Sequence, residues 1–251
     1  MIEPTADAAA VFFQSLEPAH GTTLWRYMDF TRYVALLDSS SLYFTRADQF
    51  QDPFEGSHSR LNEQMRPKIY ENIPPAVLIH MSKMSRAARG WTYVSCWHAS
   101  EHESAAMWSA YAPVQGSIAV QTTYERLRSQ VSPEVKIGRV RYIDYEKNWS
   151  PEGNLYYPFF HKRLSFDHER EVRAVFLDAE LPPGEEINTD ELQENPKKGQ
   201  LRAVSLAELV QSVRVAPTAA DWILHLVERV TLRYGFTFPI QRSALDAPPT
   251  Y

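Results

Sequence analysis

A proline-stiffened loop sets the first constraint on how this chain can fold. The loop is FQDPFE, residues 50–55. It begins four residues after the strand-like run LYFT, residues 42–45. Proline fixes its own φ and keeps Asp52 out of the α region, so neither a helix nor a central strand can continue through this point. We predict a rigid loop with Phe50 and Phe54 as apolar anchors. Asp52 and Glu55 then either serve a binding site or simply cap a turn and meet solvent.

The order of helices and strands favours an α+β protein. Strands are predicted at 22–27, 41–45, 91–97, 116–122, 135–145, 169–177, 213–215 and 237–241, and helices at 5–16, 30–38, 103–112, 156–164 and 219–234. The two types are interspersed without βαβ rhythm, and the chain has neither G-x-G-x-x-G nor a P-loop. We therefore expect a single domain, residues 1–251, with a central mixed, mostly antiparallel sheet flanked by helices.

Three segments lie outside this predicted core. Residues 1–20 are an N-terminal helix and lead-in, and residues 244–251 are a tail. Residues 178–199 are predicted to be an exposed acidic loop, because the stretch from Asp178 to Glu194 carries seven carboxylates and no Lys or Arg.

Composition limits the function classes. The formal net charge is −5 in 251 residues, so no global basic field attracts nucleic acid, although one face can still be basic. A single cysteine excludes an internal disulfide and favours a reducing compartment. The N-terminus lacks a basic signal-peptide region, and no apolar run approaches the roughly 20 residues that cross a bilayer. We predict a cytoplasmic protein without a membrane partner.

Charged residues cluster again in FDHEREVR, residues 166–173. On a strand over 169–177, Glu169, Glu171 and Arg173 would share one face. These charges either point into a cleft, with the arginine clamping one carboxylate and leaving the other available, or form a solvated surface network. An early strand adds Arg26 among apolar neighbours, and a half-buried arginine needs an anion: a carboxylate of this chain or a ligand phosphate.

Aromatic residues and possible metal ligands occupy residues 96–111. Cys96, His98 and His102 have a spacing that is compatible with zinc, but nothing nearby completes a four-ligand site, so we expect no metal. Trp97, Trp108 and Tyr111 are either core residues or the walls of a ligand site.

Four motifs, in order, resemble a known family. They are LWRYM, LYFTRADQFQDPFE, CWHASEHESAAMWSAYAPVQG and FDHEREVR, and the resemblance covers most of residues 22–243. The chain resembles the bacterial and phage-associated family called domain of unknown function 2971. That family name implies no reaction.

The layout is more distantly similar to that of ADP-ribosyltransferases. This resemblance implies NAD as a substrate, with Arg26 holding the dinucleotide, Glu171 stabilising the oxocarbenium-like transition state and Glu169 orienting or deprotonating the acceptor. In this resemblance, Tyr43 or Thr45 would be the middle-strand residue. The residues expected to line the dinucleotide site are Arg26, Tyr27, Tyr43, Thr45, Phe50, Asp52, Glu55, Trp97, Trp108, Tyr111 and Arg173. The acceptor would be a macromolecule, either nucleic acid or protein. A toxin or phage-defence effector, with an antitoxin or other partner protein, fits this class.

Two other classes remain open at the level of sequence. A metal-dependent nuclease would use Asp52, Glu55, Glu169 and Glu171 around magnesium. A non-enzymatic nucleotide-binding or interaction module would use the same acidic residues to hold the shape of a pocket.

Overall fold

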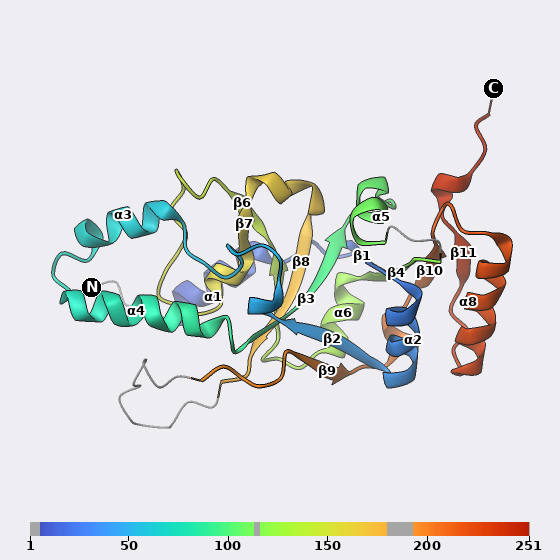
Figure 1. The fold of residues 1–251 in the computed structure, drawn as a ribbon, viewed down its shortest axis with the longest axis horizontal. Helices are drawn as coiled ribbons and strands as arrows, with labels where there is room; N and C mark the ends of the chain where they lie inside the picture. Colours follow the sequence, from blue (N-terminus) through green and yellow to red (C-terminus); the bar gives the residue numbers. More distant parts are fainter. Residues whose placement is uncertain (1–5, 113–115, 180–192, 251) are drawn as a thin grey trace.

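A forked β-sheet is the framework of the molecule (Figure 1). The computed structural model describes residues 6–112, 116–179 and 193–250. The strands are β1 (Thr23–Met28), β2 (Ser41–Arg46), β3 (Thr92–Ala99), β4 (Ile118–Thr123), β5 (Lys136–Arg139), β6 (Arg141–Ile143), β7 (His161–Arg163), β8 (Glu171–Leu177), β9 (Gly199–Ala203), β10 (Ser212–Val215) and β11 (Ile240–Arg242). The helices are α1 (Ala6–Leu16), α2 (Phe30–Ser39), α3 (Arg60–Ile69), α4 (Pro75–Ala88), α5 (Ala105–Tyr111), α6 (Tyr124–Gln130), α7 (Leu206–Leu209) and α8 (Asp221–Arg233), with short 3₁₀ turns η1 (Ala47–Gln49), η2 (Tyr157–Phe160), η3 (Leu164–Glu169) and η4 (Ala244–Asp246).

The sheet is mixed and mostly antiparallel, as the sequence predicts. Its main path runs β11-β10-β4-β1-β3-β2-β9, and β8 pairs with both β3 and β5. Among the strands of this sheet that the structure describes, only β10 and β11 pair in parallel; β6 and β7 form a separate parallel pair. The α+β class is therefore confirmed.

Strand β3 is where the sheet forks. Along one edge, β8 pairs with β3 from Thr92 to His98. The opposite edge is shared: β2 pairs at residues 93–94 and β1 at residues 98–99. Among the described residues, no strand pairs with residues 95–97 on that edge. Because α2 joins the end of β1 to the start of β2, the two strands and β3 enclose a triangular gap.

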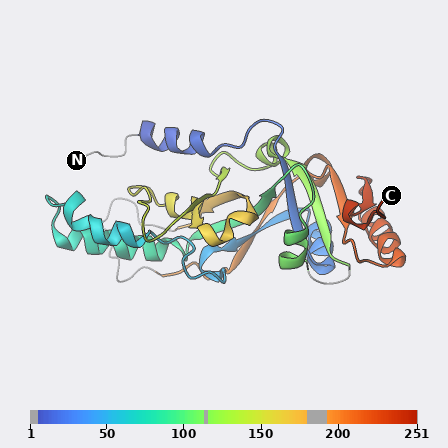
Figure 2. The ribbon, with the colours of Figure 1, turned by 90° about the horizontal axis from the view of Figure 1, so that it is seen from above.

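Two hydrophobic cores cover the two faces of the sheet. The first core packs Tyr33 and Leu37 of α2, Leu127 of α6 and Val227 of α8 against the strands. The second core packs α1 and η2 against the other face, as the view from above shows (Figure 2). Side chains of β8 alternate between them: Val172, Ala174 and Phe176 enter the first core, and Val175 enters the second.

Three predicted elements are wrong in detail. The strand predicted over 135–145 is divided into β5, which pairs with β8, and β6, which pairs with β7. The helix predicted over 156–164 is the 3₁₀ turn η2 followed by β7, which pairs with β6. The strand predicted from Glu169 begins at Glu171, because Arg170 has a φ of 42° and cannot extend the strand.

The acidic stretch is described only in part. Residues 180–192 of the predicted loop lie outside the described residues. Its final residue, Gly199, begins β9, a strand that the sequence analysis did not predict. Gly199 pairs with Thr45, and a side chain there would overlap the ring of Tyr43. A larger residue at position 199 would therefore have to displace the half-exposed ring of Tyr43.

Candidate functional site

A hollow of about 190 Å³ lies at the fork of the sheet. We call it the fork hollow; its lining residues are Trp25, Arg26, Tyr27, Thr45, Phe50, Val94, Cys96, Trp97, His98, Met107, Tyr111, Lys162 and Glu171. Residues from five strands (β1, β2, β3, β7 and β8), helix α5 and the FQDPFE loop thus meet across more than a hundred positions of sequence. Seven of the predicted site residues are brought together here: Arg26, Tyr27, Thr45, Phe50, Trp97, Tyr111 and Glu171.

Arg26 bridges the gap between β1 and β2. Its Nη2 donates to the carbonyl of Tyr43 at 2.9 Å, and its guanidinium lies 5.6 Å from the centre of the Trp97 ring. Burial lowers its pKa to about 10. No carboxylate pairs with Arg26 among the residues that the structure describes, neither Glu171 nor Asp52. Its charge is therefore available to an anionic ligand.

A buried charge network forms the floor beside this hollow. We use that name for Glu55, Lys162, Glu169, Glu171 and Arg173, all of which are at least 90% buried. The ammonium of Lys162 donates to Glu171 at 2.9 Å and to Glu169, and lies 3.4 Å from Glu55. Arg173 donates to both oxygens of Glu55 at 2.8 Å and, through Nε, to Glu171. Two cations are thus shared among three carboxylates, and the alternative of a solvated surface network is wrong.

The two glutamates of the E-x-E motif differ in their affinity for protons. Burial would raise the pKa of Glu171, but the charges of Arg173 and Lys162 outweigh it and lower the pKa to about 2. Burial raises the pKa of Glu169, and the hydrogen bond to Glu171 raises it further. Tyr111 donates its hydroxyl to Glu169, and burial raises the pKa of that phenol. Glu171 is therefore a fixed anion, and Glu169 is the member of the pair that binds a proton more readily.

Several predicted site residues lie outside the fork hollow. Asp52 receives a bond of 2.9 Å from Arg163 and one of 3.1 Å from the N–H of Phe54, so it caps its turn. Glu55 lies within the charge network instead of facing solvent. Trp108 belongs to the first core, and Tyr43 is about half exposed beside Gly199. Arg173 clamps Glu55 and Glu171, and it bonds the carbonyl of Phe159.

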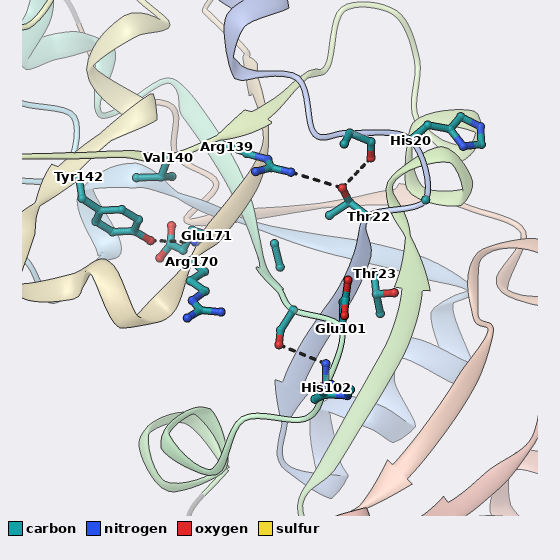
Figure 3. Close-up of a pocket in the computed structure, with 14 residues that line it drawn as sticks. His20, Thr22, Thr23, Glu101, His102, Arg139, Val140, Tyr142, Arg170 and Glu171 are labelled. Atoms are coloured by element: carbon teal, nitrogen blue, oxygen red, sulfur yellow. Dashed lines mark hydrogen bonds between the residues drawn. The ribbon is translucent and has the colours of Figure 1, made fainter.

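A larger hollow of about 750 Å³ adjoins Glu171 (Figure 3). Among its lining residues are Thr22, His102, Arg139, Tyr142 and Arg170. The hydroxyl of Tyr142 accepts a bond from the N–H of Glu171 at 2.8 Å, and Arg139 donates to Thr22 at 3.5 Å. Among the described residues no carboxylate pairs with Arg139 or Arg170. Small-molecule sites usually measure about 300–1,000 Å³, so this hollow has room for a ligand that the fork hollow alone would not hold.

Sequence reasoning missed Lys162, the cation at the centre of the charge network. Its segment was predicted to be helical, and only the parallel pairing of β7 with β6 places its side chain among the glutamates. A lysine seven residues before one glutamate and nine before the other carries no recognisable motif. Arg139, Tyr142 and Arg170 were missed for the same reason.

Cys96 and the histidines do not form a reactive or metal-binding group. Burial raises the pKa of the Cys96 thiol, which keeps it protonated. Within residues 6–112, 116–179 and 193–250, no group of three His, Cys, Asp or Glu side chains is placed to hold a metal ion. No helix in the same ranges combines the length and apolar character needed to cross a membrane.

Comparisons with known proteins add little. No protein-family profile matches the chain, and no curated protein matches it in sequence. The resemblance to the family of unknown function therefore stays a prediction. Among solved structures, the chain is similar to DarT from Thermus sp. 2.9 in complex with carba-NAD+, at 8% identity and a TM-score of 0.40, over 92% of this chain and 98% of that one.

Proposed function

We propose that this protein transfers ADP-ribose from NAD to a macromolecular acceptor. One observation carries the proposal: Arg26, a half-buried cation without a carboxylate partner among the described residues, lines the same hollow as the carboxylate of Glu171. The reaction needs these two groups together, because NAD is anionic at its phosphates and becomes cationic at the ribose as its glycosidic bond breaks.

In this proposal each of the two hollows binds one part of the NAD molecule. At about 190 Å³, the fork hollow suits the flat nicotinamide end, which its aromatic walls can stack against. Glu171 lines both hollows, so the reacting ribose would lie beside it. From the fork hollow, Arg26 would contact the phosphate nearer to the nicotinamide, and the guanidiniums of Arg139 and Arg170 in the larger hollow would face the other phosphate.

The residues then act in sequence. The bond between the ribose and the nicotinamide nitrogen breaks, and nicotinamide leaves as a neutral molecule. The fixed charge of Glu171 stabilises the positive charge that develops on the ribose. The acceptor's oxygen or nitrogen forms the new bond to the ribose and gives its proton to the hydroxyl of Tyr111, which lines the fork hollow and passes its own proton to Glu169. The raised pKa of Glu169 makes it the better base of the two glutamates.

Incubation with NAD labelled in the adenylate and with a whole-cell lysate tests this function. Label transferred to protein or nucleic acid by the wild type, and not by Glu171→Gln, is the expected result. Growth of a bacterial host that expresses either form tests the toxin or phage-defence role. Absence of transfer to every fraction, with equal growth of the two strains, would contradict the proposal.

A non-enzymatic nucleotide-binding module is the second candidate, and one observation favours it. Both oxygens of Glu171 already accept bonds from Lys162 and Arg173, so part of its charge is neutralised within the protein. Binding of NAD by calorimetry without release of nicotinamide would support this candidate.

The metal-dependent nuclease loses its support. The ammonium of Lys162 occupies the position among the three glutamates where a divalent cation would have to bind, and Asp52 is paired with Arg163.

A further inference from the structure

The helical arm formed by α3 and α4 has a charge opposite to that of the rest of the chain. The arm extends from one end of the molecule, and α8 lies at the other end (Figure 1). Residues 60–90 contain six Lys or Arg and two Glu, a net charge of +4 in a chain of net charge −5. The remaining residues therefore carry −9, and the positive charge is concentrated on one projecting element.

Two neighbouring hollows open along this arm. The first, of about 510 Å³, lies between the helices and the loop that follows Asp52; it is lined by Phe54, Gly56, Arg66, Arg86 and Arg89, among others. The second measures about 470 Å³ and shares Glu63, Arg66, Ser82 and Arg86 with the first. Leu78 and Ile79 give the second hollow an apolar wall. A charged and a partly apolar compartment thus follow one another along the arm.

The arginines of the arm differ in whether the protein neutralises them. Arg66 is paired with Glu152 at 2.8 Å, and Arg60 with Glu146 at 3.2 Å. Arg86 and Arg89 have no ion pair with any described residue, and the buried Nε of Arg89 has no hydrogen-bond partner among them. Both guanidiniums line the first hollow, so their charges are available to an anionic ligand there. Burial lowers the pKa of nearby His58 to about 4, so His58 is neutral at pH 7.

We infer that the arm binds the phosphate backbone of a nucleic acid, with Arg86 and Arg89 as the phosphate-contacting residues. Guanidiniums bind phosphate oxygens in a bidentate manner. Two compartments that share Arg86 suit a polymer in which phosphates alternate with flat, largely apolar bases, whereas an isolated phosphate ion would fill only the first. As a statement about the acceptor, this inference rests on the proposed function, but the binding itself needs no NAD.

Fluorescence anisotropy with labelled single-stranded DNA and RNA of 20 nucleotides, in the absence of NAD, tests the inference. The double variant Arg86→Gln/Arg89→Gln should bind at least about tenfold more weakly at low salt. Each phosphate contact contributes about 0.7 to the salt dependence of single-strand binding, so the slope of log affinity against log salt should fall by about 1.4. Glu63→Gln, which removes the carboxylate that lines both hollows, should tighten binding. The matched control is Arg229→Gln on exposed α8, which should change neither quantity.

Three results would overturn the inference. The first is no detectable binding of either nucleic acid at 50 mM salt. The second is an equal loss of affinity in the arm variant and in the Arg229→Gln control. The third is tighter binding of a polyglutamate peptide than of either nucleic acid, which would show that the arm binds an acidic protein. If the double variant does not fold, as judged by circular dichroism, Arg86→Gln at its exposed position provides the same comparison with half the change in slope. Labelled ADP-ribose on protein, without any nucleic-acid binding, would refute this inference while leaving the proposed function intact. Nucleic-acid binding without NAD turnover would support this inference and contradict the proposed function.

Discussion

Replacing Glu171 by glutamine separates a catalytic role from a structural one, because the charge network offers a matched control. Glu171 and Glu55 are both buried, and both accept bonds from Arg173. Only Glu171 lines the fork hollow and the larger hollow. The pair Glu171→Gln and Glu55→Gln therefore removes the same charge from the same network at two positions that differ in their access to a ligand.

The expected cost in stability is similar for the two variants. Removing one partner of a buried ion pair costs about 3–5 kcal/mol, which is a large part of the about 5–15 kcal/mol that stabilises a typical domain. For a chain of this length, each kcal/mol lowers the melting temperature by about 2–4 °C, so both variants should melt about 6–20 °C below the wild type. Both should remain folded at 20 °C, where activity is compared.

The activities should diverge. Loss of a fixed group that stabilises transition-state charge typically lowers turnover by about 100-fold or more, and we expect this for Glu171→Gln. Glu55→Gln should keep turnover within a few-fold of the wild type, since Glu55 faces Arg173 and not the hollows. The assay is release of nicotinamide from NAD at 20 °C, with differential scanning calorimetry on the same samples. Equal loss of turnover in the two variants, or none in Glu171→Gln, would refute the reasoning.

Three further predictions follow from the same contacts. Glu171 has a pKa of about 2 against an ordinary 4.5, so it contributes roughly 3 kcal/mol of stability that is present above pH 4.5 and lost as the pH falls towards 2. The raised pKa of Glu169 acts in the opposite direction and gives its full contribution below pH 4.5. Other carboxylates with lowered pKa values, such as Asp48, also lose stability between pH 4.5 and 2, so the difference between the urea-unfolding profiles of the wild type and Glu171→Gln reports Glu171, and the profile of the variant should be flatter. Arg26→Gln should weaken NAD binding about 10- to 100-fold in calorimetry with little change in melting temperature, because Arg26 is in no ion pair with a described residue; unchanged affinity would remove Arg26 from the site. Gly56→Ala should cost about 2–4 kcal/mol in chemical unfolding, because Gly56 has a φ of 69° and a Cβ there would lie 2.3 Å from the Phe159 ring; a wild-type midpoint would show that the ring can move aside.

The local features of the site could be predicted from sequence. Asp52 before a proline predicted a rigid turn and left a cap as one of two roles for this carboxylate; the bond from the N–H of Phe54 shows that Asp52 caps the turn. The apolar neighbours of Arg26 predicted a half-buried cation, and the alternating charges of the E-x-E run predicted that Glu171 and Arg173 share a face of one strand. Each of these predicted features depends only on a few residues that are adjacent in the sequence, so no distant part of the chain is needed to predict it.

Tertiary structure alone decided which charges meet. The register of β8 against β3 places Glu171 opposite His98, and the fork leaves the gap that Arg26 crosses. The parallel pairing of β7 with β6 brings Lys162 between the glutamates, so the network is buried and neutralised instead of solvated. Periodicity in a sequence assigns a side chain to a face, but its partner depends on strands that are far away along the chain. For this protein, the sequence by itself determined the stiff turn, the strands and the residue types available for chemistry, whereas long-range pairing determined their burial, their protonation and the hollow that they line.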